Sequence, residues 1–301
     1  MNIGLVLPPG VIGAPGRVLS YRELRSFALQ AEALGLDSVW VYDHLGFEFP
    51  AQSSAGVLEG WTVLTGLAEA TERVELGTFV ICTAFRNPAL LAKMAVTLDE
   101  LSDQRLILGL GAGWHEPEFT RFGLPFDHLA DRFEEAVQII APLVRQGKAD
   151  FQGAYYAAND CELLPPPIRP IPIMIAAKQP RMMRLTAQYA DSWNLNMLRR
   201  AADLREPRDA LLAITERTGR DPATLAITAG VNIGFPDLPE VADLPGSKLP
   251  EGITGRPEEI AAGLRAFANL GVGHLMAWHY PLTPEAVTRF AEAARLTRDE
   301  P

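Results

Sequence analysis

The feature that most constrains the fold of this 301-residue chain is a regular alternation of short β-rich runs with amphipathic helical patterns. The first run, Ile3 to Leu7, is continuously apolar, as expected for a parallel strand that is covered on both faces. Comparable runs recur to the end of the chain. The expected strands are 3–7, 39–42, 74–80, 105–110, 171–176, 191–195, 225–233 and 274–278.

Capping residues mark several helix starts. Ser20 and Glu23 form a capping-box pattern, and Asn87 stands directly before Pro88, which suits the first helical turn. The inward stripe of the helix that opens at Asn87 is expected to be Leu90, Leu91, Met94, Ala95 and Leu98. Further helices are expected at 60–71, 127–146, 181–189, 257–270 and 284–296, with a hairpin at about 155–164.

Eight such units in one chain favour a closed barrel, so we predict a single (β/α)8 TIM-barrel domain over residues 1–301. The alternative is an open, doubly wound sheet of the flavodoxin or Rossmann type. Two segments, 147–167 and 234–255, exceed ordinary connection lengths. They are expected to be lid insertions at the C-terminal face of the strands, or else plain surface decoration.

Composition excludes several function classes. A formal charge of −10 argues against a nucleic-acid or anionic-membrane partner. The two cysteines, Cys82 and Cys161, form neither a disulfide framework nor a metal-ligand spacing, so no metal is expected. Without a signal-peptide pattern or a long apolar window, we expect a soluble, cytoplasmic protein.

Chemistry in such a barrel is expected at the C-terminal ends of the strands. The second strand ends in Asp43-His44, and an imidazole can accept or donate a proton near neutral pH. His44 is therefore the candidate catalytic residue, although a lone histidine can also be structural. Asp43 points to the other side of the extended chain, where it could anchor the loop or a neighbouring helix end.

Two loops could hold a ligand. Gly111, Ala112 and Gly113 follow the fourth strand, where they either let a flat ring approach the backbone or allow tight strand-to-loop packing. Because this run does not follow the first strand, it is a poor dinucleotide fingerprint. The loop after the fifth strand, 176–179, precedes a helix start that favours an anion. Its residues are Ala176, Ala177, Lys178 and Gln179; Lys178 could bind a phosphate or be a solvated loop lysine.

Side chains near other strand ends are weaker candidates. Tyr42, Trp114, Trp193 and Trp278 could stack on an aromatic ligand or belong to the core. The candidate substrate contacts are Trp193, Asn194, Trp278 and His279.

Several enzyme classes lack their residues in this chain. There is no histidine pair of metal spacing after the first strand, no Gly-x-Ser-x-Gly elbow and no Walker loop. Glu116 and Glu118 stand two positions apart on one segment, so they do not flank a bond as a glycosidase pair would.

Several blocks together resemble the luciferase-like monooxygenases and their deazaflavin-dependent relatives. They are VWVYDH at 39–44, ATERVELGT at 70–78, RNPALLAK at 86–93, RLILGLGAGW at 105–114 and YADSWN at 189–194. The similarity extends over nearly the whole chain.

This resemblance implies a TIM barrel with a flavin or deazaflavin ring at the strand C-termini. It implies that His44 lies beside the ring and substrate, and that a non-proline cis peptide near Phe79-Val80 supports the ring. The segment from Ala176 to Pro180 would take the cofactor phosphate. Members commonly form homodimers through helices of the second and third units.

The blocks resemble most the branch that uses coenzyme F420, in which the ring carries hydride and His44 would move the matching proton. Two positions depart from family patterns. Trp114 stands where sugar-phosphate dehydrogenases of the branch have an acidic residue, and Lys178 stands where a glycine is usual. The alternatives are a two-component monooxygenase that receives reduced FMN from a separate reductase, and a catalytically silent flavin-binding barrel.

Overall fold

The computed structural model describes residues 1–10, 18–47, 56–244 and 248–299. Eight parallel strands form a closed ring, because β1 pairs with both β2 and β12, and β9 pairs with both β8 and β10. The strands of the ring are β1 Asn2–Val6, β2 Ser38–Val41, β3 Glu75–Thr78, β5 Leu106–Gly111, β8 Ile173–Ala176, β9 Ser192–Leu198, β10 Ala226–Gly234 and β12 Val272–Tyr280. The predicted TIM barrel is confirmed, and the open doubly wound sheet is excluded.

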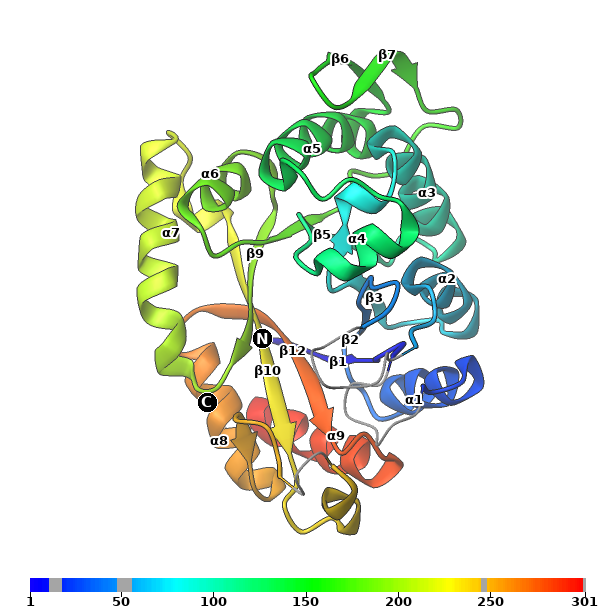
Figure 1. The fold of residues 1–301 in the computed structure, drawn as a ribbon. Coiled ribbons are helices and arrows are strands. Elements are labelled where there is room, and N and C mark those ends of the chain that lie inside the picture. Colours follow the sequence, from blue (N-terminus) through cyan, green and yellow to red (C-terminus); the bar gives the residue numbers. More distant parts are fainter. Residues whose placement is uncertain (11–17, 48–55, 245–247, 300–301) are drawn as a thin grey trace.

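Helices surround the ring (Figure 1). They are α1 Tyr21–Ala33, α2 Gly60–Ala70, α3 Pro88–Leu101, α5 Leu129–Gln146, α6 Pro180–Tyr189, α7 Arg205–Arg217, α8 Pro257–Ala268 and α9 Pro284–Asp299, with α4 Glu116–Phe122 after β5. Short 3-10 turns occur at Thr83–Phe85, Ala201–Leu204, Pro222–Thr224 and Pro239–Asp243. The Ser20–Glu23 capping box and the Asn87 N-cap are both present, which confirms these two predicted helix starts.

Two helices, α4 and α7, lie where the sequence pattern predicted none. Helix α7 fully buries only Leu211 and Thr215, with Leu212 and Ile214 half-buried against the core, so its apolar stripe is short, and α4 has only seven residues. The predicted stripe of α3 was wrong at Leu90, which is 55% exposed. The buried side of α3 runs instead through Leu91, Ala92, Ala95, Val96 and Leu98.

The largest fully buried side chain of the barrel interior is Trp40, which packs in a cluster with Val6, Phe79, Met174 and Met276. Trp40 of β2 is fully buried, and a Cβ atom at Gly77 would lie 1.9 Å from its ring, while one at Gly4 would lie 2.6 Å from its Nε1. Glycine at both positions therefore makes room for the indole. Trp40 Nε1 donates to Ser38 Oγ at 2.7 Å, and Ser38 Oγ lies 2.7 Å from Nε2 of the buried His274. Trp40, Ser38 and His274 therefore fill the lower part of the barrel interior, which leaves the C-terminal ends of the strands as the place for a cavity.

The segment 147–167 does not form the expected lid. It contains an antiparallel hairpin of β6 Lys148–Gln152 and β7 Ala157–Glu162, which lies on the outer side of α5 (Figure 1). The backbone N–H groups of residues 154–156 donate to the Glu135 carboxylate of α5, and Tyr155 packs on Arg132. The hairpin is held away from the barrel mouth because the segment follows α5, which returns the chain to the N-terminal face.

The segment 234–255 does begin at the C-terminal face, because it follows β10. Its last part, β11 Ile253–Thr254, pairs with the end of β10, and Asn232 Nδ2 donates to the Glu251 carbonyl at 2.9 Å. Residues 245–247 lie outside the described residues. Within the part of the chain that the structure describes, no helix is both long and apolar enough to cross a membrane.

Stability is expected to fall in acid because of His279. This side chain is buried between β12 and α9, with Phe290 at 4.5 Å between ring centroids, and burial lowers its pKa from 6.5 to about 3. In the unfolded chain the same imidazole binds a proton below about pH 6.5. Acidification therefore favours the unfolded state from about pH 6.5 down to about pH 3, by about 1.4 kcal/mol per pH unit.

We predict that His279→Leu removes about 2 kcal/mol of the stability loss between pH 8 and pH 5, measured by urea unfolding at both pH values. The control is His128→Gln, at a histidine whose side chain is 57% exposed. An unchanged pH dependence in His279→Leu would contradict the prediction.

Candidate active site

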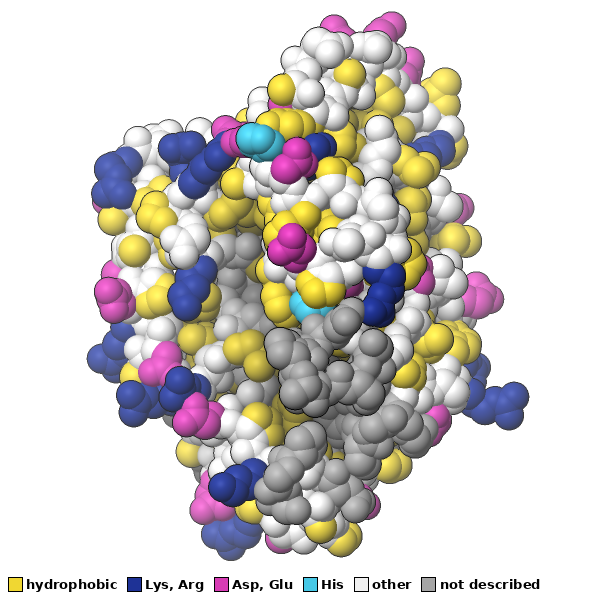
Figure 2. Space-filling model, in the orientation of Figure 1, with side chains coloured by type: hydrophobic (Ala, Val, Ile, Leu, Met, Phe, Trp, Pro, Cys, Tyr) yellow, Lys and Arg dark blue, Asp and Glu magenta, His cyan; other side chains and the backbone are white. Residues whose placement is uncertain are grey.

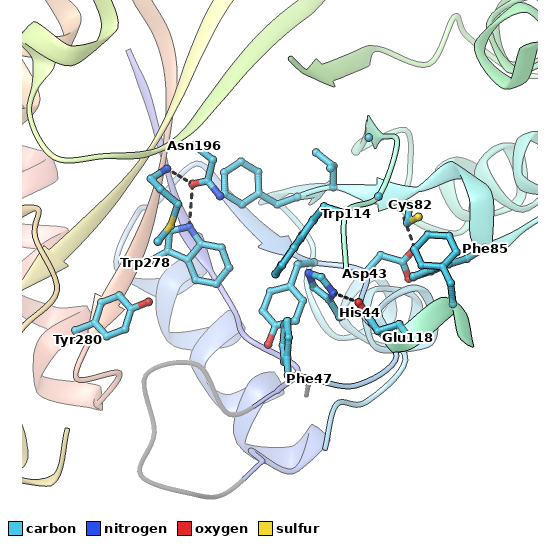
Figure 3. A pocket seen from close by; sticks show the side chains of 17 residues that line it. Asp43, His44, Phe47, Cys82, Phe85, Trp114, Glu118, Asn196, Trp278 and Tyr280 are labelled. Carbon is cyan, nitrogen blue, oxygen red and sulfur yellow. Dashed lines mark hydrogen bonds and ion pairs between the residues drawn. The ribbon is translucent and has the colours of Figure 1, made fainter. Parts of the chain in front are cut away.

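A cavity of about 400 Å³ opens where the strands end (Figure 3). Its walls come from the ends of β2, β3, β5, β9 and β12 and from α4. Aromatic side chains predominate, namely Tyr42, Phe47, Phe79, Phe85, Trp114, Phe119, Trp278 and Tyr280. Tyr42 stacks on Trp278 with ring centroids 5.6 Å apart. A cavity of this size with aromatic walls fits a planar ring with a small molecule beside it.

His44 lines this cavity and is held by a carboxylate from another element. Its Nδ1 lies 2.7 Å from Oε1 of Glu118, which is buried in α4. The second oxygen, Oε2, accepts from the backbone N–H groups of Leu45 and Gly46. The rings of Phe47 and Trp114 pack on the imidazole, at centroid distances of 4.4 and 5.7 Å.

The Asp43 side chain points away from His44 and anchors the same loop to neighbouring elements. Its carboxylate accepts from Arg86 at 2.6 and 3.0 Å and from the Cys82 backbone N–H at 3.1 Å. Burial raises the pKa of Asp43, and Arg86 opposes that shift. The guanidinium also pairs with Glu59, the N-cap residue of α2. This geometry supports the anchor interpretation of Asp43, although the residue also borders the cavity.

The expected non-proline cis peptide is present between Phe79 and Val80, and both residues line the cavity. The glycine run beside it is explained by packing. A Cβ atom at Gly111 would lie 2.6 Å from a Val80 methyl, and one at Gly113 would lie 2.6 Å from the Cys82 sulfur. Gly111 and Gly113 also line the cavity, so close packing and ring approach are compatible at these positions.

A second cavity, of about 800 Å³, adjoins the first, because Asn196 and Met197 line both. Lys178 borders this second cavity, together with Arg199 and Arg200. Arg199 pairs with Glu251 at 2.6 Å and Arg200 with Asp203 at 3.0 Å. In the space-filling view of this face, Lys and Arg side chains are frequent along α6 and α7 (Figure 2). The 176–179 loop thus lies beside the extension of the first cavity.

Three of the four predicted substrate contacts lie away from the cavity, which corrects that expectation. Trp193 is fully buried in the outer core and donates to the Ala177 carbonyl at 2.7 Å. His279 faces α9, and Asn194 is buried within the barrel, where it donates to Thr228. Side chains alternate along a strand, so the neighbours of a cavity residue point elsewhere. Trp278 lines the cavity, and its Nε1 donates to Asn196 Oδ1 at 3.2 Å.

The structure adds residues that the sequence did not single out for this site. Glu118 was considered as a poor glycosidase carboxylate and as a neighbour of the family-like block at 105–114, and Arg86 and Met197 were not considered as site residues. Arg86 and Glu118 both lie in or beside the family-like blocks, which was the one available signal. Their partners are distant in sequence, so spacing could not pair them.

The cavity is poor in charge. Among its described lining residues there is no lysine or arginine, and its two carboxylates, Asp43 and Glu118, are both engaged. Burial raises the pKa of the Cys82 thiol to about 12 and that of Tyr280 to about 12, so both stay protonated at neutral pH. No cluster of three or more potential metal ligands occurs among the described residues.

Comparison with protein families gives a match to the model described as luciferase-like monooxygenase, over residues 1–243. An F420-dependent glucose-6-phosphate dehydrogenase from Intrasporangium calvum is 30% identical over 295 residues, which cover 85% of this chain and 88% of that protein. The pyrimidine monooxygenase RutA from Methylobacterium radiotolerans is 36% identical over 203 residues, 64% of this chain and 53% of the relative. The chain therefore spans about half the length of this second relative.

Solved structures share the fold at low sequence identity. An F420-dependent secondary alcohol dehydrogenase in complex with an F420-acetone adduct superposes with a TM-score of 0.82 at 20% identity, covering 99% of both chains. The EDTA monooxygenase EmoA from a Chelativorans species gives a TM-score of 0.81 at 13% identity, covering 99% of this chain and 94% of the other.

The Asp43–Arg86 pair generates a stability prediction. Arg86→Met leaves a buried carboxylate without its cation, so we expect the free energy of unfolding to fall by about 3–5 kcal/mol in urea denaturation. Arg295→Met, at an exposed pair on α9, is the control and should change stability by less than about 0.5 kcal/mol. Adding Asp43→Leu to Arg86→Met should recover part of the loss; equal stability of Arg86→Met and the parent protein would contradict the anchor.

Proposed function

This chain belongs to the luciferase-like monooxygenase family, and we propose that it is an F420-dependent oxidoreductase. In this proposal it transfers hydride between the deazaflavin and a small organic substrate, with His44 assisting proton transfer. The observation that carries the proposal is the position of His44 on the wall of an aromatic cavity at the strand C-termini, with Nδ1 held by Glu118. Nε2 then remains on the side of the ring that faces the cavity (Figure 3).

The residues present fit a deazaflavin or flavin. The ring would lie in the aromatic cavity against Phe79, Val80 and the backbone of 111–114, and the phosphate beside the 176–179 loop with Lys178. The bound ring would supply or accept a hydride. The protein's own part is to orient the reactants, to exclude water with the aromatic wall and to move a proton at His44 Nε2.

The choice of F420 is supported by the glucose-6-phosphate dehydrogenase relative, whose match extends over 88% of its length. FMN-dependent monooxygenation is the second candidate, supported by the higher identity of 36% to RutA over a shorter stretch. In that case a separate reductase would supply reduced FMN.

We propose that the substrate is uncharged and largely apolar. The described cavity wall offers no cation for a phosphate or carboxylate group. Trp114 and Met197 border the cavity and remain 62% and 57% exposed, so they offer apolar surface that a substrate would cover. Trp278 stays a proposed contact, whereas Trp193, Asn194 and His279 do not reach the cavity.

We also propose a homodimer that uses α3, whose Leu90 and Leu101 are 55% and 49% exposed. In sedimentation experiments, we expect the parent protein to be a dimer and the Leu90→Arg variant to be a monomer. A monomeric parent protein would refute the proposal.

Titration with both cofactors tests the proposed function. We expect fluorescence quenching to report binding of F420 at lower concentration than FMN, and reduction of F420 by short secondary alcohols or other neutral donors without consumption of oxygen. Oxygen-dependent turnover with reduced FMN would favour the monooxygenase instead. Ring binding with no turnover in either assay would favour a silent flavin-binding barrel.

The proton-transfer role of His44 gives a separate prediction. His44→Ala should keep cofactor affinity within about threefold and lower kcat by about 10²–10⁴-fold, because general acid–base catalysis contributes on that scale. His128→Ala, at an exposed histidine on the far end of the α4–α5 connection, is the matched control and should keep parental kcat. Parental activity in His44→Ala would remove His44 from the reaction.

A further inference from the structure

Glu118 is a buried carboxylate with an unusual set of partners. It is 3% exposed and belongs to α4, whereas its carboxylate is hydrogen-bonded to the loop after β2. Oε1 faces His44 Nδ1 at 2.7 Å, and Oε2 accepts from the N–H groups of Leu45 and Gly46. The carboxylate thus holds the histidine and the backbone that carries it.

These contacts determine which imidazole nitrogen carries the proton. Oε2 accepts from both backbone N–H groups, an arrangement that suits an ionised carboxylate, and an ionised carboxylate can only accept hydrogen bonds. Opposite such a carboxylate Nδ1 is the donor, which corresponds to the neutral imidazole of His44 with its proton on Nδ1 and its lone pair on Nε2. Nε2 is the nitrogen on the cavity side of the ring (Figure 3).

No other described acidic group competes for this histidine. Asp43 is bound to Arg86, and Cys82 is a buried thiol whose pKa is raised to about 12. His115 packs against Trp114 and Phe47, at 5.0 and 6.0 Å between centroids. Tyr42 meets the His44 ring edge-on at 5.5 Å. The aromatic neighbours restrict rotation of the imidazole, and Glu118 selects its tautomer.

We propose that Glu118 is the positioning residue of His44, which keeps Nε2 unprotonated and aimed at the substrate in the resting protein. This inference rests on the proposed function for its chemistry. In the oxidative direction, the substrate O–H bond would break and an N–H bond would form at Nε2, while the C–H bond on the same carbon gives up a hydride and a C=O bond forms; a bound deazaflavin would be the hydride acceptor. The resulting imidazolium keeps its Nδ1–H on Glu118, and the reverse reaction returns the Nε2 proton.

Glu118→Gln separates this role from a merely structural one. The amide oxygen can still accept from Leu45 and Gly46, so the loop keeps its backbone contacts. The amide NH2 then faces Nδ1 and favours the tautomer with its proton on Nε2, which cannot accept the substrate proton. Glu116→Gln is the matched control, because Glu116 lies exposed in the same helix.

The first readout needs no cofactor or activity. The ¹⁵N shifts of His44, assigned by comparison with His44→Ala, should show Nδ1–H in the parent protein and in Glu116→Gln, and Nε2–H in Glu118→Gln. A parent His44 with its neutral proton on Nε2 would overturn the proposal, whether or not any variant folds. An unchanged tautomer in folded Glu118→Gln would overturn it as well.

The second readout is kinetic. Glu118→Gln should lower kcat by about 10²–10⁴-fold with KM and cofactor affinity nearly unchanged, since a misoriented tautomer costs on that scale. In the His44→Ala variant, the additional Glu118→Gln substitution should lower kcat by less than about threefold.

The two proposals fail separately. The expected tautomer change without turnover on any cofactor would refute the F420-dependent reaction and leave the positioning role in place. Parental kcat in Glu118→Gln would refute the positioning role alone.

Discussion

The closed ring of eight parallel strands is the constraint on which the rest of this molecule depends. Pairing of β1 with β12 joins the two ends of the chain, so that Tyr42 from the second strand stacks on Trp278 from the last. All strands run in one direction, which brings their C-terminal ends to one rim. Trp40 and the side chains that pack on it fill the interior below that rim, and the cavity forms above it.

The loop after β2 illustrates how two adjacent residues take opposite tasks. Asp43 and His44 point to different sides of an extended backbone, so one reaches Arg86 behind the rim and the other the cavity. Each is held by an oppositely charged or complementary partner from a different β/α unit. The histidine is therefore placed by contacts from α4, and the loop itself by contacts from Cys82 and Arg86, which precede α3.

Sequence patterns predicted the barrel, its strands and the positions of Asp43, His44, Phe79 and Val80 well, because a buried parallel strand leaves a continuous apolar run. They failed where a single residue decides the outcome. The side chains of neighbouring residues in a strand point to opposite faces, so an error of one position in the predicted strand puts Trp193 or His279 on the wrong face. A strand boundary predicted from sequence is not accurate to one residue. Helix α7 was missed because its apolar stripe is short, with Leu211, Leu212 and Ile214 against the core. The 147–167 segment was misplaced because length alone does not reveal the surface it packs on.

The amino-acid sequence by itself determined the alternating units, the capping of α1 and α3, the acidic charge and the aromatic character of the strand ends. The units and caps depend on residues within one or two helical turns of one another, and the net charge depends only on the composition of the chain. Only the tertiary structure decided that Glu118 faces His44 across 74 residues and that Arg86 faces Asp43 across 43. These pairs form because the closed barrel brings separate β/α units into contact. A local sequence pattern cannot predict which residues meet when they are that far apart in the chain.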